Sequence, residues 1–360
     1  MSNSQRLNWV DMAKGISIIL VVMMHSAYGV GRETDQTGYL HWIIGWATPF
    51  RMPEFFVISG LFLSQVIDRD WRRFADRRVV HYLYFYALWA VIQIIYVVAV
   101  DDANPATAVS YIALAVVEPY GVLWFVYMLA VCSAVTKLLH NLKVPHAVVL
   151  VIAAVLQMAP IAVGSQIVDR FAEYFVYFYA SYALAPLLFN VVDWTQRHVA
   201  LSLLGLLAWG VAEAVIVFSP GFAVGPTGFT GGLSELPGVR LVLAFIGATA
   251  LCVAAAMLIR LSFMDWLRWL GSNSIVVYVS FSIPLSAAIT ILLKLGFDFN
   301  TGLMSTIALM AAVTAPLLLY WLTQVTGRGR FLFDRPAWAH LPGAPGSRQQ
   351  GEKPVANPAQ

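Results

Sequence analysis

Residues 14–26 of the chain read KGISIILVVMMHS, a nearly unbroken apolar run that contains one histidine, His25. Apolar runs of roughly 17–25 residues can cross a lipid bilayer as a helix. An ionisable side chain inside such a run is costly, so it usually faces a polar cavity or marks a functional site. The stretch therefore predicts a membrane-spanning helix that carries a functional histidine. The alternative is a neutral histidine that makes one hydrogen bond between helices.

The composition of the whole chain extends this prediction. Of the 360 residues, 60% are hydrophobic and 11% are charged, whereas soluble domains carry about 25% charged residues. The sequence therefore predicts an all-α polytopic membrane protein. The net charge of +3 does not indicate a nucleic-acid partner. Both cysteines, Cys132 and Cys252, lie in apolar segments and are predicted to be core residues rather than a disulfide.

Apolar segments predict about ten transmembrane helices, centred near residues 23, 56, 90, 131, 154, 180, 209, 250, 283 and 314. Lys and Arg are concentrated in every second loop between the predicted helices, and the loops between these contain few. This asymmetry sets the orientation of a membrane protein, with the basic loops in the cytoplasm. With both termini in the cytoplasm, only five of the 22 basic residues fall elsewhere: Arg32, Arg51, Arg170, Arg240 and Lys294.

The domain organisation predicted from these segments is simple. Residues 1–326 form one integral-membrane domain, because the apolar segments follow one another without a soluble insertion. From Gly327 the chain becomes polar and rich in Pro, Gly, Gln and Arg, a composition typical of disorder. Residues 327–360 are therefore predicted to be a disordered cytoplasmic tail.

Lys14 and His25 share one helix face. They are eleven residues apart, about three helical turns or roughly 16 Å, which is too far for an ion pair. A cation at the cytoplasmic mouth and a base near mid-membrane are placed to contact the two ends of one long ligand. The alternative for Lys14 is ordinary snorkelling at a helix end.

A second unusual stretch, GWATPFRMPEFFVISG at residues 45–60, contains two prolines. Pro49 and Pro53 predict a break in the second transmembrane helix, with Pro53 at the first position of the new segment. Broken helices inside membranes line binding sites, because their free backbone groups face the ligand. Arg51 and Glu54 are predicted to form walls of a polar pocket there; the alternative is that they pair with each other.

A third stretch, DRDWRRFADRR at residues 68–78, is rich in arginine. The planar guanidinium group suits phosphate recognition, so this loop is predicted to bind the phosphates of a ligand. The alternatives are the positive-inside signal and attraction to anionic lipid. The five arginines of this loop are Arg69, Arg72, Arg73, Arg77 and Arg78.

These stretches together resemble the acyltransferase-3 family of integral-membrane O-acyltransferases. DMAKGISIILVVMMHS at 11–26 is similar to the opening family signature, through the Lys14–His25 spacing and Asp11. RMPEFFVISGLFL at 51–63 resembles the second signature, which includes Ser59. The segments LWFVYML, with Trp124, and WLGSNSIVVYVSF, with Tyr278, resemble later family patterns. Many members have a histidine shortly after that tyrosine, where this chain has Phe281.

The resemblance implies transfer of an acyl group, often acetyl, from cytoplasmic acyl-CoA to a hydroxyl of a carbohydrate or small molecule. It implies acyl-CoA as donor substrate, no metal, membrane lipid as a partner, and a bacterial-type plasma membrane. With the residue patterns it predicts His25, Arg51 and Glu54 as catalytic, and Lys14 and the loop arginines as ligands of CoA. Residues predicted to line the substrate pocket are Asp11, Ser59, Trp124, Glu235 and Tyr278.

Two routes of catalysis stay open at this stage. His25, with an ordinary pKa near 6.5, can act as general base on the acceptor hydroxyl, or it can form an acyl-histidine. Arg51 and the helix start near Pro53 are placed to stabilise an oxyanion. A proton-coupled transporter or flippase for a lipid-linked saccharide or small acid is the alternative function, because a broken helix with a His/Arg/Glu group suits transport as well.

Overall fold

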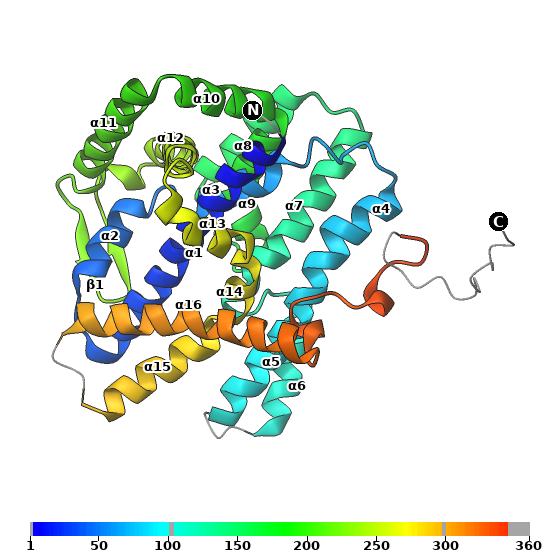
Figure 1. Ribbon diagram of the computed structural model, residues 1–360, viewed down its shortest axis with the longest axis vertical. Coiled ribbons are helices and arrows are strands. Elements are labelled where there is room, and N and C mark those ends of the chain that lie inside the picture. The colour runs from blue at the N-terminus through cyan, green and yellow to red at the C-terminus, as the bar shows by residue number, and fades with distance from the viewer. Residues whose placement is uncertain (1–2, 101–103, 297–299, 345–360) are drawn as a thin grey trace, which may run out of the picture.

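The computed structural model describes residues 3–100, 104–296 and 300–344 (Figure 1). Almost all regular structure in these ranges is helical. The α-helices are α1 (Asn3–Thr34), α2 (Tyr39–Ala47), α3 (Arg51–Leu61), α4 (Trp71–Ala75), α5 (His81–Val100), α6 (Pro105–Leu114), α7 (Trp124–Asn141), α8 (His146–Met158), α9 (Gln166–Ala183), α10 (Ala185–Arg197), α11 (Val199–Val217), α12 (Pro237–Leu258), α13 (Asp265–Ser272), α14 (Ser274–Ser280), α15 (Ser282–Lys294) and α16 (Thr301–Thr326). A hairpin of β1 (Ala223–Gly225) and β2 (Gly228–Thr230) lies between α11 and α12.

The helices confirm an all-α membrane protein. Six are long and apolar enough to cross a bilayer, and the number rises to eight if each of two bent helix pairs is one span. The bent pairs are α9 with α10, at 73°, and α14 with α15, at 57°. All ten predicted centres fall within helices, but α3 and α8 have only 11 and 13 residues. A count of ten transmembrane helices is therefore not confirmed.

The surface of α11 is the clearest lipid-facing surface. Leu203, Leu204 and Leu207 expose 54%, 62% and 66% of their area, although leucine is normally buried in a water-soluble protein. A helix that is apolar all round and exposed is stable when lipid tails rather than water cover it. The exposure therefore agrees with a helix at the lipid boundary.

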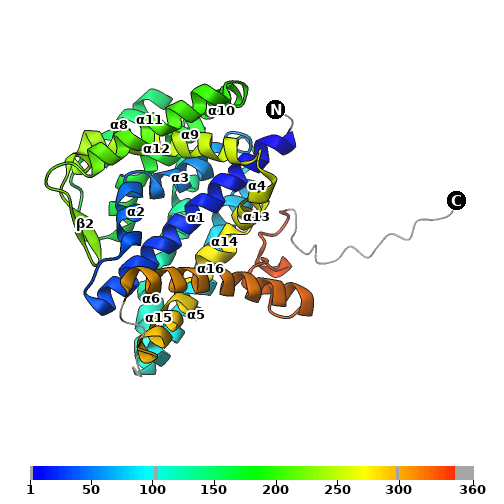
Figure 2. The same cartoon turned by 60° about the vertical axis from the view of Figure 1, so that its left-hand side comes forward.

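Helix α1 runs through the middle of the molecule (Figures 1 and 2). It packs against α3, α12, α13 and α16. Its contact with α13 depends on two glycines: a Cβ atom at Gly271 would lie 1.6 Å from the carbonyl oxygen of Asp11, and one at Gly15 would lie 2.2 Å from that of Leu267. The backbones of α1 and α13 therefore touch directly, which fixes the position of the Lys14 end of α1.

Residues 48–50, next to Pro49, separate α2 from α3, but these two helices are not one of the bent pairs that could form a span, so a broken second transmembrane helix is not confirmed. The new helix begins at Arg51, so the prediction that Pro53 occupies its first position is wrong by two residues. Proline is tolerated there because the first four backbone N–H groups of a helix have no intrahelical partner. Neither α2 nor α3 is long enough to cross a bilayer alone.

The prediction of a disordered tail from residue 327 is wrong for residues 327–344. Phe333 belongs to the main hydrophobic core, and the indole of Trp89 on α5 donates a hydrogen bond of 3.0 Å to the carbonyl of Leu332. The apolar residues within this polar segment supply the packing that its average composition hides. Residues 345–360, the rest of the predicted tail, lie outside the described residues.

Candidate functional site

His25 lines a cavity of about 710 Å³, the largest of the three cavities described here. Its ring lies 5.2 Å from the ring of Phe281, centroid to centroid, with the planes tilted by 42°. Tyr28 and Arg32 continue the wall along α1, and Phe281 and α15 form the opposite side. The predicted functional histidine therefore faces a cavity.

Arg51 approaches this cavity from α3. Only 7% of its surface is exposed, and its guanidinium lies beside the phenol of Tyr28, which lines the His25 cavity. Its Nε and Nη1 atoms have no hydrogen-bond partner in the described part of the chain. A buried cation with free donors beside the cavity is suited to holding an oxygen anion.

Glu54 lies apart from this group, although it is only three residues from Arg51. Its carboxylate is fully buried and accepts a hydrogen bond of 2.5 Å from Ser17 Oγ on α1. Among the described residues it forms no ion pair with Arg51, and it lines neither the His25 cavity nor the two cavities described below. The contact joins α3 to α1 within the core.

A smaller cavity of about 220 Å³ lies toward the N-terminal end of α1 and contains Lys14, Ser59 and Tyr278. Lys14 Nζ is 3.3 Å from a carboxylate oxygen of Asp11, which orients the amine. Ser59 Oγ donates to the carbonyl of its own helix at Phe55, 2.7 Å away, as expected for a packing serine. Three of the predicted site residues therefore meet in this inner cavity, with Asp11 as the partner of one of them.

Tyr278 stands between the inner cavity and the His25 cavity. Its hydroxyl donates to the carbonyl of Val122, a residue that lines the His25 cavity. Its ring lies 6.3 Å from that of Phe281, which also lines the His25 cavity. Tyr278 and Phe281 thus form a side-chain partition between the two cavities.

The predicted arginine loop, residues 68–78, is helical from Trp71 onward, as α4 and a π turn, Asp76–Val80, and we keep the name arginine loop for these residues. It lines a third cavity of about 440 Å³, here called the arginine pocket. Four of the five predicted arginines line it; Arg72 instead lies near Gly343. His81 lines both the arginine pocket and the inner cavity, so the two adjoin at this side chain. The residues that line the arginine pocket are Val66, Arg69, Arg73, Phe74, Arg77, Arg78, His81, Arg335 and His340.

Lys137 on α7 holds the start of the arginine loop. Only 4% of this residue is exposed, and its amine donates to the carbonyls of Ile67 and Arg69, the latter at 2.9 Å. The amine also lies 5.9 Å from the ring centroid of Trp71 and 5.7 Å from that of Phe74. The loop is therefore anchored by a buried cation.

Two predicted pocket residues lie away from the three cavities. Trp124 packs under the guanidinium of Arg170, 4.9 Å from its ring centroid, and Glu173 joins Arg170 to Arg240. Glu235 is exposed on a short 3₁₀ turn, Leu233–Glu235. Both lie next to charged groups or solvent rather than beside His25.

Sequence reasoning missed His81, Tyr28, Arg335 and His340. His81 follows Arg77 by four residues, so helical spacing places both on one face and was a usable signal. Tyr28 follows His25 by three residues on the same helix, which is a similar signal. Arg335 and His340 are more than 250 residues from the loop that they join, so no local pattern predicts their position.

Comparison with known proteins agrees with these motifs. The family model for the acyltransferase-3 group, described as an acyltransferase domain, matches residues 7–321. This range includes His25, Arg51, Lys14 and the whole arginine loop. No curated protein and no solved structure matches the chain.

Proposed function

The chain belongs to the acyltransferase-3 family, and from that premise we propose that it moves an acyl group, acetyl in the simplest case, from cytoplasmic acyl-CoA to a hydroxyl group. The proposed acceptor is a carbohydrate or another component of the cell envelope, and the proposed location is a bacterial-type plasma membrane. One observation carries the proposal beyond the family: His81 lines both the arginine pocket and the inner cavity, and the contact between Tyr278 and Phe281 links the inner cavity to the His25 cavity.

The cavities match the parts of an acyl-CoA in order. The arginine pocket takes the phosphate groups, since guanidinium groups bind phosphate oxygens in pairs. The pantetheine arm of the acyl-CoA passes His81 into the inner cavity, where Lys14 and Ser59 supply polar contacts. The thioester then reaches the partition formed by Tyr278 and Phe281, next to His25. In this assignment the thioester of the acyl-CoA and the imidazole of His25 meet at the partition.

The proposed chemistry needs one base and one stabilised anion. His25 removes the proton of the acceptor hydroxyl, and the oxygen attacks the thioester carbonyl carbon. The carbonyl electrons move onto oxygen, and the unpartnered donors of Arg51 stabilise that anion. When the anion collapses, the C–S bond breaks, and the CoA sulfur takes the proton from the His25 imidazolium. The products are the acylated acceptor and free CoA.

The His25 cavity supports a polyhydroxylated acceptor. Its far wall carries the hydroxyls of Ser282, Ser286 and Thr290, and its rim carries Glu33 and Lys294. A sugar hydroxyl both donates and accepts hydrogen bonds, and these hydroxyl and charged side chains supply acceptors and donors for it. Glu54, Trp124 and Glu235 take no direct part in this proposal, because they lie outside the cavities.

The test uses purified protein in nanodiscs with radiolabelled acetyl-CoA, and needs no acceptor. We expect slow CoA release or label on the protein for the wild type and for His198→Ala, a control at the exposed junction of α10 and α11. We expect neither for His25→Ala. If the wild type turns over neither acetyl-CoA nor succinyl-CoA, the acyltransferase proposal fails and transport assays of lipid-linked saccharides follow.

A further inference from the structure

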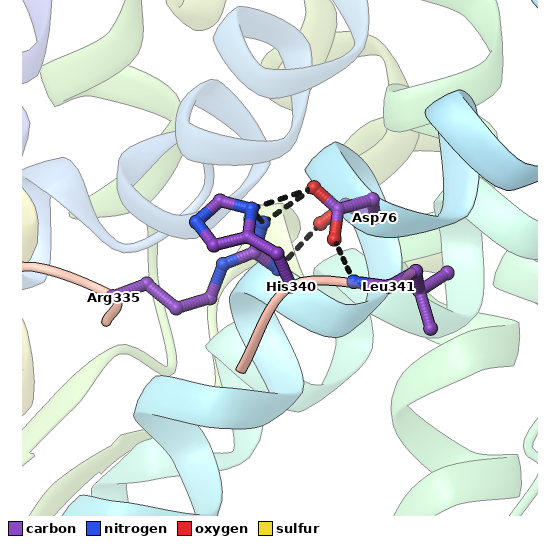
Figure 3. Close-up of polar contacts among 4 residues, drawn as sticks. All are labelled: Asp76, Arg335, His340 and Leu341. Atoms are coloured by element: carbon purple, nitrogen blue, oxygen red, sulfur yellow. Dashed lines mark hydrogen bonds and ion pairs between the residues drawn. The ribbon is translucent and has the colours of Figure 1, made fainter. Parts of the chain in front are cut away.

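One buried carboxylate ties the C-terminal segment to the arginine loop (Figure 3). Asp76 has no exposed surface, and both of its oxygens are bound by residues more than 250 positions away. Arg335 donates from Nη1 to the Asp76 carbonyl and from Nη2 to Oδ2, each at 2.6 Å. The backbone N–H of Leu341 donates to Oδ1 at 2.7 Å, and His340 Nδ1 lies 3.1 Å from Oδ2. We call residues 330–341 the clasp.

The position of Asp76 explains why it can serve as this anchor. It begins a single π turn, Asp76–Val80, where α4 continues into α5. The turn follows Arg73 in the sequence and itself contains Arg77 and Arg78. A buried charge is stable only when it is paired and hydrogen-bonded, and the clasp supplies these partners. The arginine loop and the clasp are therefore one unit.

The clasp completes the arginine pocket. Arg335 and His340 line it together with the loop residues Arg69, Arg77 and Arg78. The Nε atom of Arg335 is buried and has no hydrogen-bond partner within residues 3–100, 104–296 and 300–344. The lining of the pocket contains five guanidinium groups and two imidazoles but no carboxylate.

The charges of this pocket are only partly matched by the protein. Asp76 pairs with Arg335, and Asp70 lies 3.5 Å from Arg73. In the described part of the chain, Arg69, Arg77 and Arg78 form no ion pair. Three unmatched cations around a hollow of about 440 Å³ favour a ligand with several negative charges.

From these contacts we infer that the clasp is the second wall of a phosphate site, in which Asp76 holds Arg335 and His340 against the phosphate groups of the nucleotide end of the acyl donor. The inference rests on the proposed function for the identity of the ligand. It adds Arg335 and His340 as binding residues and Asp76 as a positioning residue. All three act on donor binding, at the opposite end of the cavities from His25.

The experiment measures binding of adenosine 3′,5′-bisphosphate, the nucleotide probe, to full-length protein in phosphatidylcholine nanodiscs by calorimetry. Arg335→Met and Asp76→Asn are each expected to weaken binding about tenfold or more, as for loss of a charge-assisted contact. The double variant is expected to bind no more weakly than the worse single variant, because both act through one contact. Arg330→Met is the matched control: it removes a clasp arginine that binds the Gln324 carbonyl outside the pocket.

A second measurement uses only the wild-type protein, so its result does not depend on whether a variant folds. Hydrogen exchange of the wild-type clasp, at residues 330–341, is expected to slow when the probe is added. Unchanged exchange, or wild-type affinity in both Arg335→Met and Asp76→Asn, overturns the inference. If Arg77→Met alone weakens binding, the donor site of the proposed function stands and the role of the clasp fails. If the wild type does not bind the probe and does not turn over acyl-CoA, both proposals fail.

An anionic lipid headgroup is the other source of phosphate at this surface. Repeating the titration in phosphatidylglycerol nanodiscs separates the two sources. We expect the affinity for the probe to stay within about threefold, since screening weakens interactions between separated charges at physiological salt. Loss of probe binding in phosphatidylglycerol, restored in phosphatidylcholine, would assign the pocket to lipid and overturn the inference.

Discussion

The two ends of α1 are built in opposite ways. At the Lys14 end, α13 touches the backbone of α1 through Gly15 and Gly271, and the adjoining cavity is only about 220 Å³. At the His25 end the adjoining cavity is about 710 Å³ and is lined by side chains of α1 and α15. The comparison teaches that one end sets the position of the helix while the other leaves room for two reactants.

The His25 end gives the largest expected effect. We expect His25→Ala to lower acyl transfer about a hundred- to ten-thousand-fold, the usual contribution of a general base. Binding of CoA should stay within about twofold, because the arginine pocket and the His25 cavity share no lining residue. Turnover and calorimetry on the same preparation measure both. If CoA binding falls with turnover, the two ends are not separate in function.

The Lys14 end gives the next effect, on stability. Gly271→Ala is expected to lower the free energy of unfolding by about 1–3 kcal/mol, because the added methyl group overlaps the Asp11 carbonyl oxygen. Gly205→Ala on α11 is the matched control, since a Cβ atom there meets nothing within 4 Å. It should be neutral or stabilising by up to about 1 kcal/mol. Thermal unfolding in nanodiscs compares the two, and equal shifts would contradict a backbone contact between α1 and α13.

The two ends also differ in how well the sequence predicts them. The spacing of Lys14 and His25 on one helix predicted that both face a ligand path, because helical periodicity is a local rule. The glycine contact itself was not predicted, since a helical sequence does not state which helix it will touch. Likewise, Glu54 lies buried in the core, only three residues from Arg51, and its hydrogen-bond partner there is Ser17 of another helix. Local patterns gave the helices and their polar faces, and long-range packing decided the partners.

The clasp shows the same limit more sharply. Average composition predicted disorder from residue 327, yet Phe333 and Trp338 pack against Trp89 and Tyr84 of α5. A short segment with several aromatic residues within a polar region was the available signal. The pairing of Arg335 with Asp76 had no signal of its own, because the two are 259 positions apart.

A third prediction concerns how the arginine loop is held. Lys137→Met keeps the chain length against Trp71 and Phe74 but removes the charge that holds the carbonyls of Ile67 and Arg69. We expect KM for the acyl donor to rise about tenfold, with kcat within about twofold, as for loss of a charged hydrogen bond that positions the loop. Steady-state kinetics separate the two constants.

The control for Lys137 is Arg328→Met, which removes one positive charge from an exposed position outside the arginine pocket. It should leave both constants unchanged. A fall in kcat with unchanged KM for Lys137→Met would mean that the loop acts on the chemical step, which would erase the distinction between the two ends.

The smallest effect is expected at the partition between the inner and His25 cavities. Tyr278→Phe keeps the ring against Phe281 and removes only the hydroxyl that donates to the Val122 carbonyl. One neutral hydrogen bond contributes about 0.5–1.5 kcal/mol, so we expect kcat to fall about two- to tenfold with little change in donor binding. A loss as large as that of His25→Ala would make Tyr278 a reacting group. An unchanged kcat would mean that the ring alone directs the thioester from the closely packed end of α1 to the open one.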